Sequence, residues 1–135
     1  MRPRIEQELA LLRRAYGEVE HTEVAGEDWF RLPRYQLPAG WRIGDKSVAD
    51  IPVIFLIKAD YPGSPPYGFL TPVGLNFNGN PPGNIGGAPK PPPFSGDWMH
   101  FSWSVENWVA TADVNKGSNL VAWCRSFSER FKEGA

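Results

Sequence analysis

The chain has 135 residues, of which 14 are glycine and 14 are proline, and this content excludes an all-helical bundle. A hydrophobic fraction of 41% with only 21% charged residues excludes a disordered chain. The net charge of −1 provides no basic surface for nucleic acid, and no apolar run approaches the about 18 residues that a membrane span requires. We therefore expect a single domain, residues 1–135, with neither nucleic acid nor a membrane as its partner.

The N-terminal segment predicts an amphipathic helix over residues 3–16. Apolar residues recur there at spacings of three or four, as on one helical face: Ile5, Leu9, Leu12 and Tyr16. Gly17 stands where the helix should end. The arginines of the opposite face form either a solvated surface or a docking surface for a partner. The N-terminus lacks the apolar core of a secretory signal, so we expect a cytoplasmic protein, in agreement with a single cysteine.

Four strands are predicted next, over residues 24–32, 41–43, 53–59 and 68–77. Each stretch is rich in aromatic or β-branched residues and is bounded by glycine or proline. Residues 53–59 are apolar on both parities, which indicates a strand buried on both faces. Short connections between these neighbours favour a four-stranded antiparallel meander.

Residues 78–96 contain five glycines and six prolines, and this composition predicts a long irregular flap and no regular element. Such a segment is either a functional loop or a tolerated surface insertion. After it, residues 98–105 alternate between apolar and polar side chains, as in a half-buried strand. Residues 115–131 then predict a second amphipathic helix, with Asn115 or Ser118 as its N-cap. The predicted fold class is α+β.

The residues that carry chemistry are few. No glycine-rich phosphate-binding motif occurs, and the only candidate soft metal ligands, His21, His100 and Cys124, have no paired spacing, so we expect no cofactor and no metal. Cys124 falls near the apolar face of the second helix, where a thiol is usually buried and unreactive.

The alternating strand places three polar residues on one side: His100, Ser102 and Ser104. A serine hydroxyl is a weak nucleophile that needs a base, and His100 lies two residues from Ser102 on the same face. A nearby carboxylate could serve instead, and the candidates are Asp97, Glu106 and Asp113. The alternative is an amphipathic edge strand with a solvated polar face.

One motif leads to a family. The run Tyr61-Pro62-Gly63-Ser64-Pro65-Pro66, directly after a buried strand, resembles the Tyr-Pro-x-x-Pro-Pro turn of the ubiquitin-conjugating enzyme superfamily. The resemblance implies a conjugating-enzyme-like fold: an N-terminal helix, a four-stranded antiparallel meander, a long Gly/Pro-rich active-site segment, a tryptophan and a C-terminal helix. Trp108 would be that tryptophan.

The spacing of Trp98, Ser102, Trp108 and Asp113 is similar to that of the bacterial branch, the prokaryotic family E proteins. Members of that branch are encoded beside ubiquitin-like proteins and activating enzymes, and the resemblance implies both as partners. It also implies a carrier that accepts the C-terminus of the ubiquitin-like protein as an ester and passes it to a target nucleophile. The N-terminal helix would meet the activating enzyme.

The chain departs from the family at the nucleophile. The family's His-Pro-Asn triplet and the cysteine shortly before the tryptophan are both missing, and Cys124 lies well past Trp108. The resemblance therefore implies an oxyester on Ser102, or on Ser104, with His100 as base and Asn107 or Asp113 orienting or stabilising the reacting groups. The alternative is a catalytically silent module that binds the ubiquitin-like protein or the activating enzyme. A third interpretation is an unrelated aromatic-rich ligand-binding domain.

Overall fold

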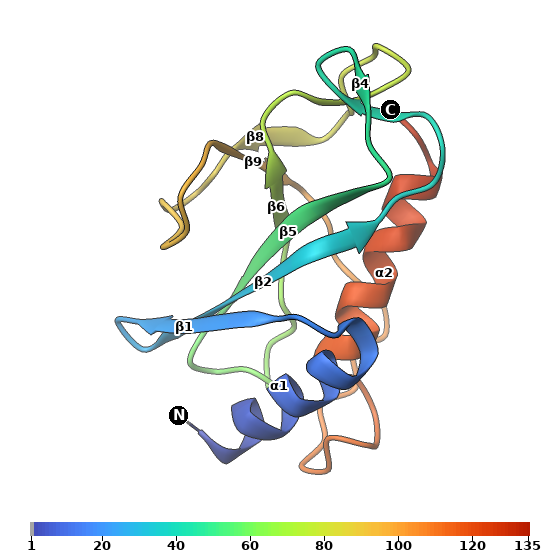
Figure 1. Cartoon of the computed structure of the whole chain (residues 1–135). Helices are drawn as coiled ribbons and strands as arrows, with labels where there is room; N and C mark the ends of the chain where they lie inside the picture. The colour runs from blue at the N-terminus through green and yellow to red at the C-terminus, as the bar shows by residue number, and fades with distance from the viewer. Residues whose placement is uncertain (1) are drawn as a thin grey trace.

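The computed structural model describes residues 2–135 and confirms the α+β class, with two helices packed on an antiparallel sheet (Figure 1). The helices are α1 (Pro3–Tyr16) and α2 (Leu120–Lys132). The main sheet has six strands in the order β1-β2-β5-β6-β9-β8. Its members are β1 (Glu20–Val24), β2 (Glu27–Gln36), β5 (Asp50–Ile57), β6 (Phe69–Pro72), β8 (Ile85–Gly87) and β9 (Trp98–Phe101). A separate three-stranded sheet, in the order β4-β3-β7, consists of β3 (Trp41–Ile43), β4 (Lys46–Ser47) and β7 (Leu75–Phe77).

The prediction of a four-stranded meander is therefore wrong in three respects. The first predicted strand, 24–32, spans the turn of a hairpin, because Ala25 and Gly26 have φ of 52° and 80° and join β1 to β2. The last, 68–77, is two strands in different sheets, since the chain turns at Gly74 with φ of 90°. Strand β3 leaves the main sheet and pairs with β4 and β7 instead.

Residues 78–96 are also more regular than predicted. Ile85–Gly87 forms β8, which pairs with β9 at the edge of the main sheet. The glycines present no side chains that could obstruct the approach to β9, and the prolines lie outside the paired residues, where their missing N–H groups cost no ladder hydrogen bond. Strand β9 ends at Phe101, short of the predicted residue 105.

The helix ends follow local chemistry. Gly17 terminates α1 with φ of 80°, as predicted. Helix α2 begins at Leu120 and not at residue 115, because Gly117 has φ of 73° and interrupts the helical path. Its N-cap is Asn119, whose side-chain oxygen accepts a hydrogen bond from the Ala122 N–H at 2.9 Å. Neither helix in the described residues is long and apolar enough to cross a membrane.

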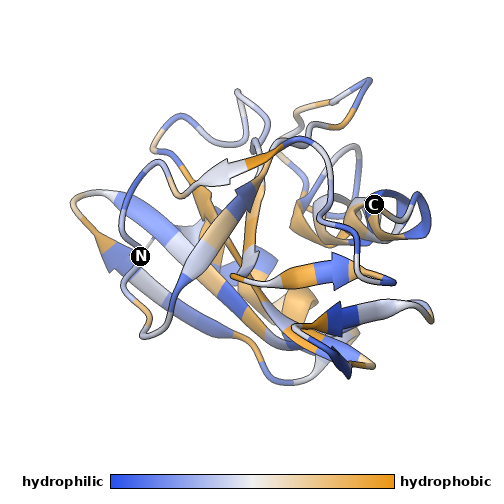
Figure 2. Cartoon of the chain, turned by 90° about the horizontal axis from the view of Figure 1, so that it is seen from above, coloured by the Kyte–Doolittle hydropathy of each residue, from blue (hydrophilic) through white to orange (hydrophobic). Residues whose placement is uncertain are grey.

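The core lies between the helices and one face of the sheet, and it is largely aromatic. Phe69 stacks on Phe127 of α2 with ring centroids 4.3 Å apart. A smaller cluster on the other sheet face contains Trp29, Ile54 and Leu70, and residues of the 78–96 segment pack over it. The strands are accordingly banded with hydrophobic and hydrophilic residues in Figure 2. Strand β5 is thus buried on both faces, as predicted, with helices over one face and the Gly/Pro-rich segment over the other.

A buried carboxylate joins three parts of this fold. Glu8 of α1 is 0% exposed, and its Oε1 accepts a hydrogen bond from the Leu120 N–H at 2.9 Å, at the first turn of α2. Its Oε2 accepts from the Tyr61 hydroxyl and from Arg4 Nε, the latter at 3.0 Å. Both carboxylate oxygens therefore accept hydrogen bonds, which a buried carboxylate needs in order to be tolerated.

We predict that Glu8→Ala lowers the free energy of unfolding by about 3 kcal/mol, because it leaves two buried donors and the partly buried Arg4 guanidinium without this acceptor. Chemical denaturation followed by tryptophan fluorescence measures this loss. Glu6→Ala, on the exposed face of the same helix, is the matched control and should change stability far less. Equal losses in the two variants would contradict the role assigned to Glu8.

Candidate functional site

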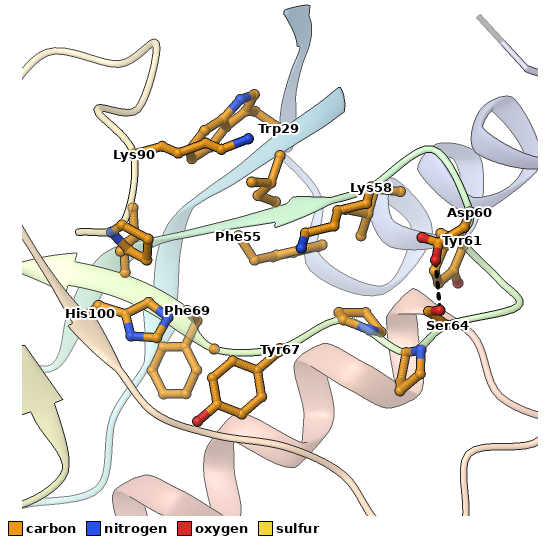
Figure 3. Close-up of a pocket in the computed structure, with 17 residues that line it drawn as sticks. Trp29, Phe55, Lys58, Asp60, Tyr61, Ser64, Tyr67, Phe69, Lys90 and His100 are labelled. Atoms are coloured by element: carbon orange, nitrogen blue, oxygen red, sulfur yellow. Dashed lines mark hydrogen bonds between the residues drawn. The ribbon is translucent and has the colours of Figure 1, made fainter. Parts of the chain in front are cut away.

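A groove of about 390 Å³ opens where two neighbouring strands of the main sheet diverge. Strands β5 and β6 share a single registered pair, Ile54 with Leu70. Beyond it, β5 continues alongside β2 as far as Ile57, whereas the segment from Ser64 to Gly68 lies apart from it. The groove occupies the space between them (Figure 3).

The groove has an apolar floor and a polar rim. Phe55 and Phe69 lie beneath it, both almost fully buried. The charged or polar residues of its lining are Lys58, Asp60, Ser64, Tyr67, Lys90 and His100. Lys90 Nζ pairs with Glu27 Oε1 at 2.6 Å, and Asp60 Oδ2 accepts a hydrogen bond from Ser64 Oγ at 2.7 Å.

Lys58 is the free cation of this lining. No ion pair in the described part of the chain includes its ammonium group. Figure 3 shows its side chain reaching into the space between β5 and the Tyr67 segment. The groove thus combines aromatic surface with one ammonium group that is in no ion pair among the described residues.

The proline-rich turn that forms one wall is held from three sides. The Tyr61 hydroxyl donates to Glu8, and Arg2 Nη1 donates to the Tyr61 carbonyl at 2.6 Å. Trp108 Nε1 donates to the Pro62 carbonyl at 2.9 Å, and the Tyr61 and Trp108 rings are 5.8 Å apart. The two segments on which the family resemblance depends therefore meet at this wall.

His100 is the predicted site residue that lines the groove. It projects from β9 on the face opposite the core, as Trp98 does, because alternate side chains of a strand point the same way. Burial lowers the pKa of its imidazole below the usual 6.5, so the ring is neutral at pH 7. The ring lies over Gly68, and the Tyr67 ring is 6.1 Å from it.

The predicted nucleophiles, Ser102 and Ser104, are exposed and lie outside the groove lining. The Ser102 N–H donates to the Asn84 carbonyl at 2.9 Å, which ties it to the residue before β8. Among the described residues no hydrogen bond joins the Ser102 or Ser104 hydroxyl to His100. The serines suggested as nucleophiles thus lie beyond the end of β9, and neither is paired with the suggested base, His100.

The remaining candidates lie elsewhere. Asn107 is exposed with φ of 57°, in a turn beyond β9. Asp113 belongs to the loop before α2, where its Oδ1 accepts a hydrogen bond from the Asn115 N–H at 2.9 Å. Neither residue lines the groove formed by the described residues. Sequence reasoning missed Lys58, Tyr67 and Lys90, although Lys58 could have been noticed as the first charge after a continuous apolar strand.

Cys124 has the position predicted for it. It is 0% exposed within α2, and burial raises the pKa of its thiol well above the usual value. A thiol in this state is a poor nucleophile and a poor metal ligand. No group of three or more histidine, cysteine or acidic side chains in residues 2–135 is arranged to hold a metal ion.

The chemistry available at the groove is that of recognition. An apolar floor and one free ammonium suit an extended apolar segment with an anionic group, and neutral His100 can donate or accept a hydrogen bond. Comparisons with models of known protein families, with curated proteins and with solved structures each find no match for this chain.

We predict that Gly68→Ala displaces the His100 ring and lowers stability by about 2 kcal/mol. Gly68 has φ of 75°, and a Cβ there would lie 2.0 Å from His100 Nε2. Chemical shifts of the His100 ring and thermal unfolding report the two effects. The control is Gly86→Ala, where a Cβ meets nothing within 4 Å, and unchanged His100 shifts in Gly68→Ala would contradict this packing.

The lowered pKa of His100 also predicts a pH dependence. As pH falls below about 6.5, the unfolded chain takes up the proton before the folded chain does, so stability decreases toward about pH 5. In His100→Gln this part of the decrease should be lost. An NMR titration of the imidazole, assigned with that variant, should give a midpoint below 6.5, and a midpoint above it would contradict the burial effect.

Proposed function

We propose that this chain is a conjugating-enzyme-like domain of a bacterial ubiquitin-like conjugation pathway, and that it binds the ubiquitin-like protein or its activating enzyme without a covalent bond. The observation that carries the proposal is the contact between the Tyr61–Pro66 turn and Trp108. These elements lie more than forty residues apart in sequence, and the Trp108 Nε1 to Pro62 hydrogen bond of 2.9 Å joins them beside the groove.

The non-covalent form is favoured by the state of the possible nucleophiles. The thiol of Cys124 is enclosed by the core, and its raised pKa keeps it protonated. Ser102 has no base within hydrogen-bonding reach among the described side chains, and a serine oxyester also transfers less readily than a thioester. Binding needs none of these groups.

A second candidate is the carrier itself, with an oxyester on Ser102. It is favoured by the exposure of Ser102, two residues after His100 in the chain, because the lowered pKa of His100 leaves its ring neutral and able to accept a proton. The bond from Ser102 Oγ to the carbonyl carbon of the ubiquitin-like C-terminus would form as the bond to the activating enzyme breaks. The hydroxyl proton would pass to His100.

One experiment separates the candidates. The chain is incubated with the ubiquitin-like protein and activating enzyme of the same genome and ATP, and then analysed on denaturing gels with and without hydroxide. We expect no adduct, and calorimetry should show binding that Ser102→Ala leaves unchanged. Tyr67→Ala, which removes a side chain 62% exposed beside the groove, should weaken binding about ten-fold.

Val73→Ala is the control for Tyr67→Ala, because Val73 is 54% exposed but does not line the groove. A hydroxide-sensitive adduct that Ser102→Ala abolishes would establish the carrier instead. Absence of both adduct and measurable binding to either protein would contradict the proposed function altogether.

A further inference from the structure

The wall of the groove formed by β5 is an open sheet edge. Residues 55–57 pair with β2 on one side, at Phe30, Trp29 and Asp28 respectively. On the other side, no backbone hydrogen bond in the described chain joins them to residues 64–68. Alternate residues of a strand point their N–H and C=O groups to the same edge. Every second residue within 55–57 therefore directs its backbone N–H and C=O groups into the groove.

Backbone groups of this kind need a partner. Inside a protein nearly all of them are hydrogen-bonded, and an exposed strand edge is the template on which an added strand forms. The turn from Tyr61 to Pro66 keeps the next strand away, and the contacts of Tyr61 with Glu8 and of Pro62 with Trp108 hold it there. The gap is therefore built into the fold.

The charged side chains of the groove indicate which chemical group a bound ligand would place at one end of the groove. Lys90 is paired with Glu27, and Asp60 accepts the Ser64 hydroxyl, while the ammonium of Lys58 has no anionic partner among the described residues. Lys58 directly follows β5, so its charge lies at the end of the open edge. The Asp60 carboxylate is engaged by the Ser64 hydroxyl, so a carboxylate brought by an occupant could form the ion pair that Lys58 lacks.

We propose that this groove binds the free C-terminus of a polypeptide as an added strand along β5, with its terminal carboxylate on Lys58 and its side chains over Phe55 and Phe69. Residues 55–58 span about 13 Å when extended, which is the length of about four residues of an added strand. Backbone hydrogen bonds would supply affinity, and the apolar floor would select small or apolar side chains. Any polypeptide with such an end would fit, whether or not the domain binds a ubiquitin-like protein.

The probe for this site is the synthetic peptide N-acetyl-Ala-Val-Ala-Val with a free carboxylate. NMR titration of the whole chain should show binding, with hydrogen exchange slowed at amides within residues 55–57. The peptide amide should bind about ten-fold more weakly, since it lacks the charge that Lys58 pairs with. A peptide N-methylated at its central residues should also bind at least ten-fold more weakly, because it cannot form the ladder.

Variants identify the cation. Lys58→Gln should weaken binding of the free acid about five-fold and leave binding of the amide unchanged, whereas Lys116→Gln, at an exposed lysine outside the groove, should alter neither. Three results would overturn the proposal: no binding of the tetrapeptide at millimolar concentration, equal binding of acid and amide, or equal binding of the N-methylated peptide. Binding of N-acetylvaline as tight as that of the tetrapeptide would also overturn it, because it would define a site for small carboxylates.

Discussion

The buried carboxylate of Glu8 is the constraint on which the arrangement of this domain depends. A charge that is fully enclosed must find donors, and Glu8 finds them on α1, at the start of α2 and on Tyr61. These three attachments place both helices relative to the proline-rich turn. Arg130 acts similarly at the other end of the molecule, where its guanidinium donates to the carbonyls of Gly83 and Gly134 and lies over the Phe101 ring. Two buried charges thus attach the helices to segments that lie outside the sheets, Tyr61 in one case and Gly83 in the other.

The groove is a consequence of how the turn is held. Strands β5 and β6 would be expected to pair along their length, yet the turn carries the chain away from β5 after a single pair. The floor is formed by the same phenylalanines that pack against α2, so the groove lies directly over the core. His100 can approach its wall so closely because Gly68 has no Cβ. Position, floor and rim therefore come from packing, and none of them requires a bound group.

The residues behind the family resemblance differ in what they do here. Tyr61 and Trp108 are structural, since they fix the wall of the groove through one hydrogen bond each and a mutual ring contact. His100 faces the groove as a neutral imidazole, while the hydroxyl of Ser102 is exposed and makes no hydrogen bond among the described residues. Asp113 is engaged in its own loop. This distribution favours recognition over covalent chemistry.

Local patterns in the sequence were sufficient to predict both helices, the doubly buried strand, the glycine stop after α1 and the burial of Cys124, because each depends on neighbours within a few positions. The same patterns predicted a strand that carries both His100 and Ser102, but β9 ends at Phe101 and leaves Ser102 just beyond it. They could not show that β3 leaves the main sheet or that Ile85–Gly87 forms a strand, since pairing partners are chosen by contacts far apart in sequence. The groove is likewise a feature that depends on contacts between residues far apart in sequence. The sequence of residues 50–70 does not by itself predict that β5 and β6 separate. The separation depends on Glu8, Arg2 and Trp108, which contact the turn from other parts of the chain.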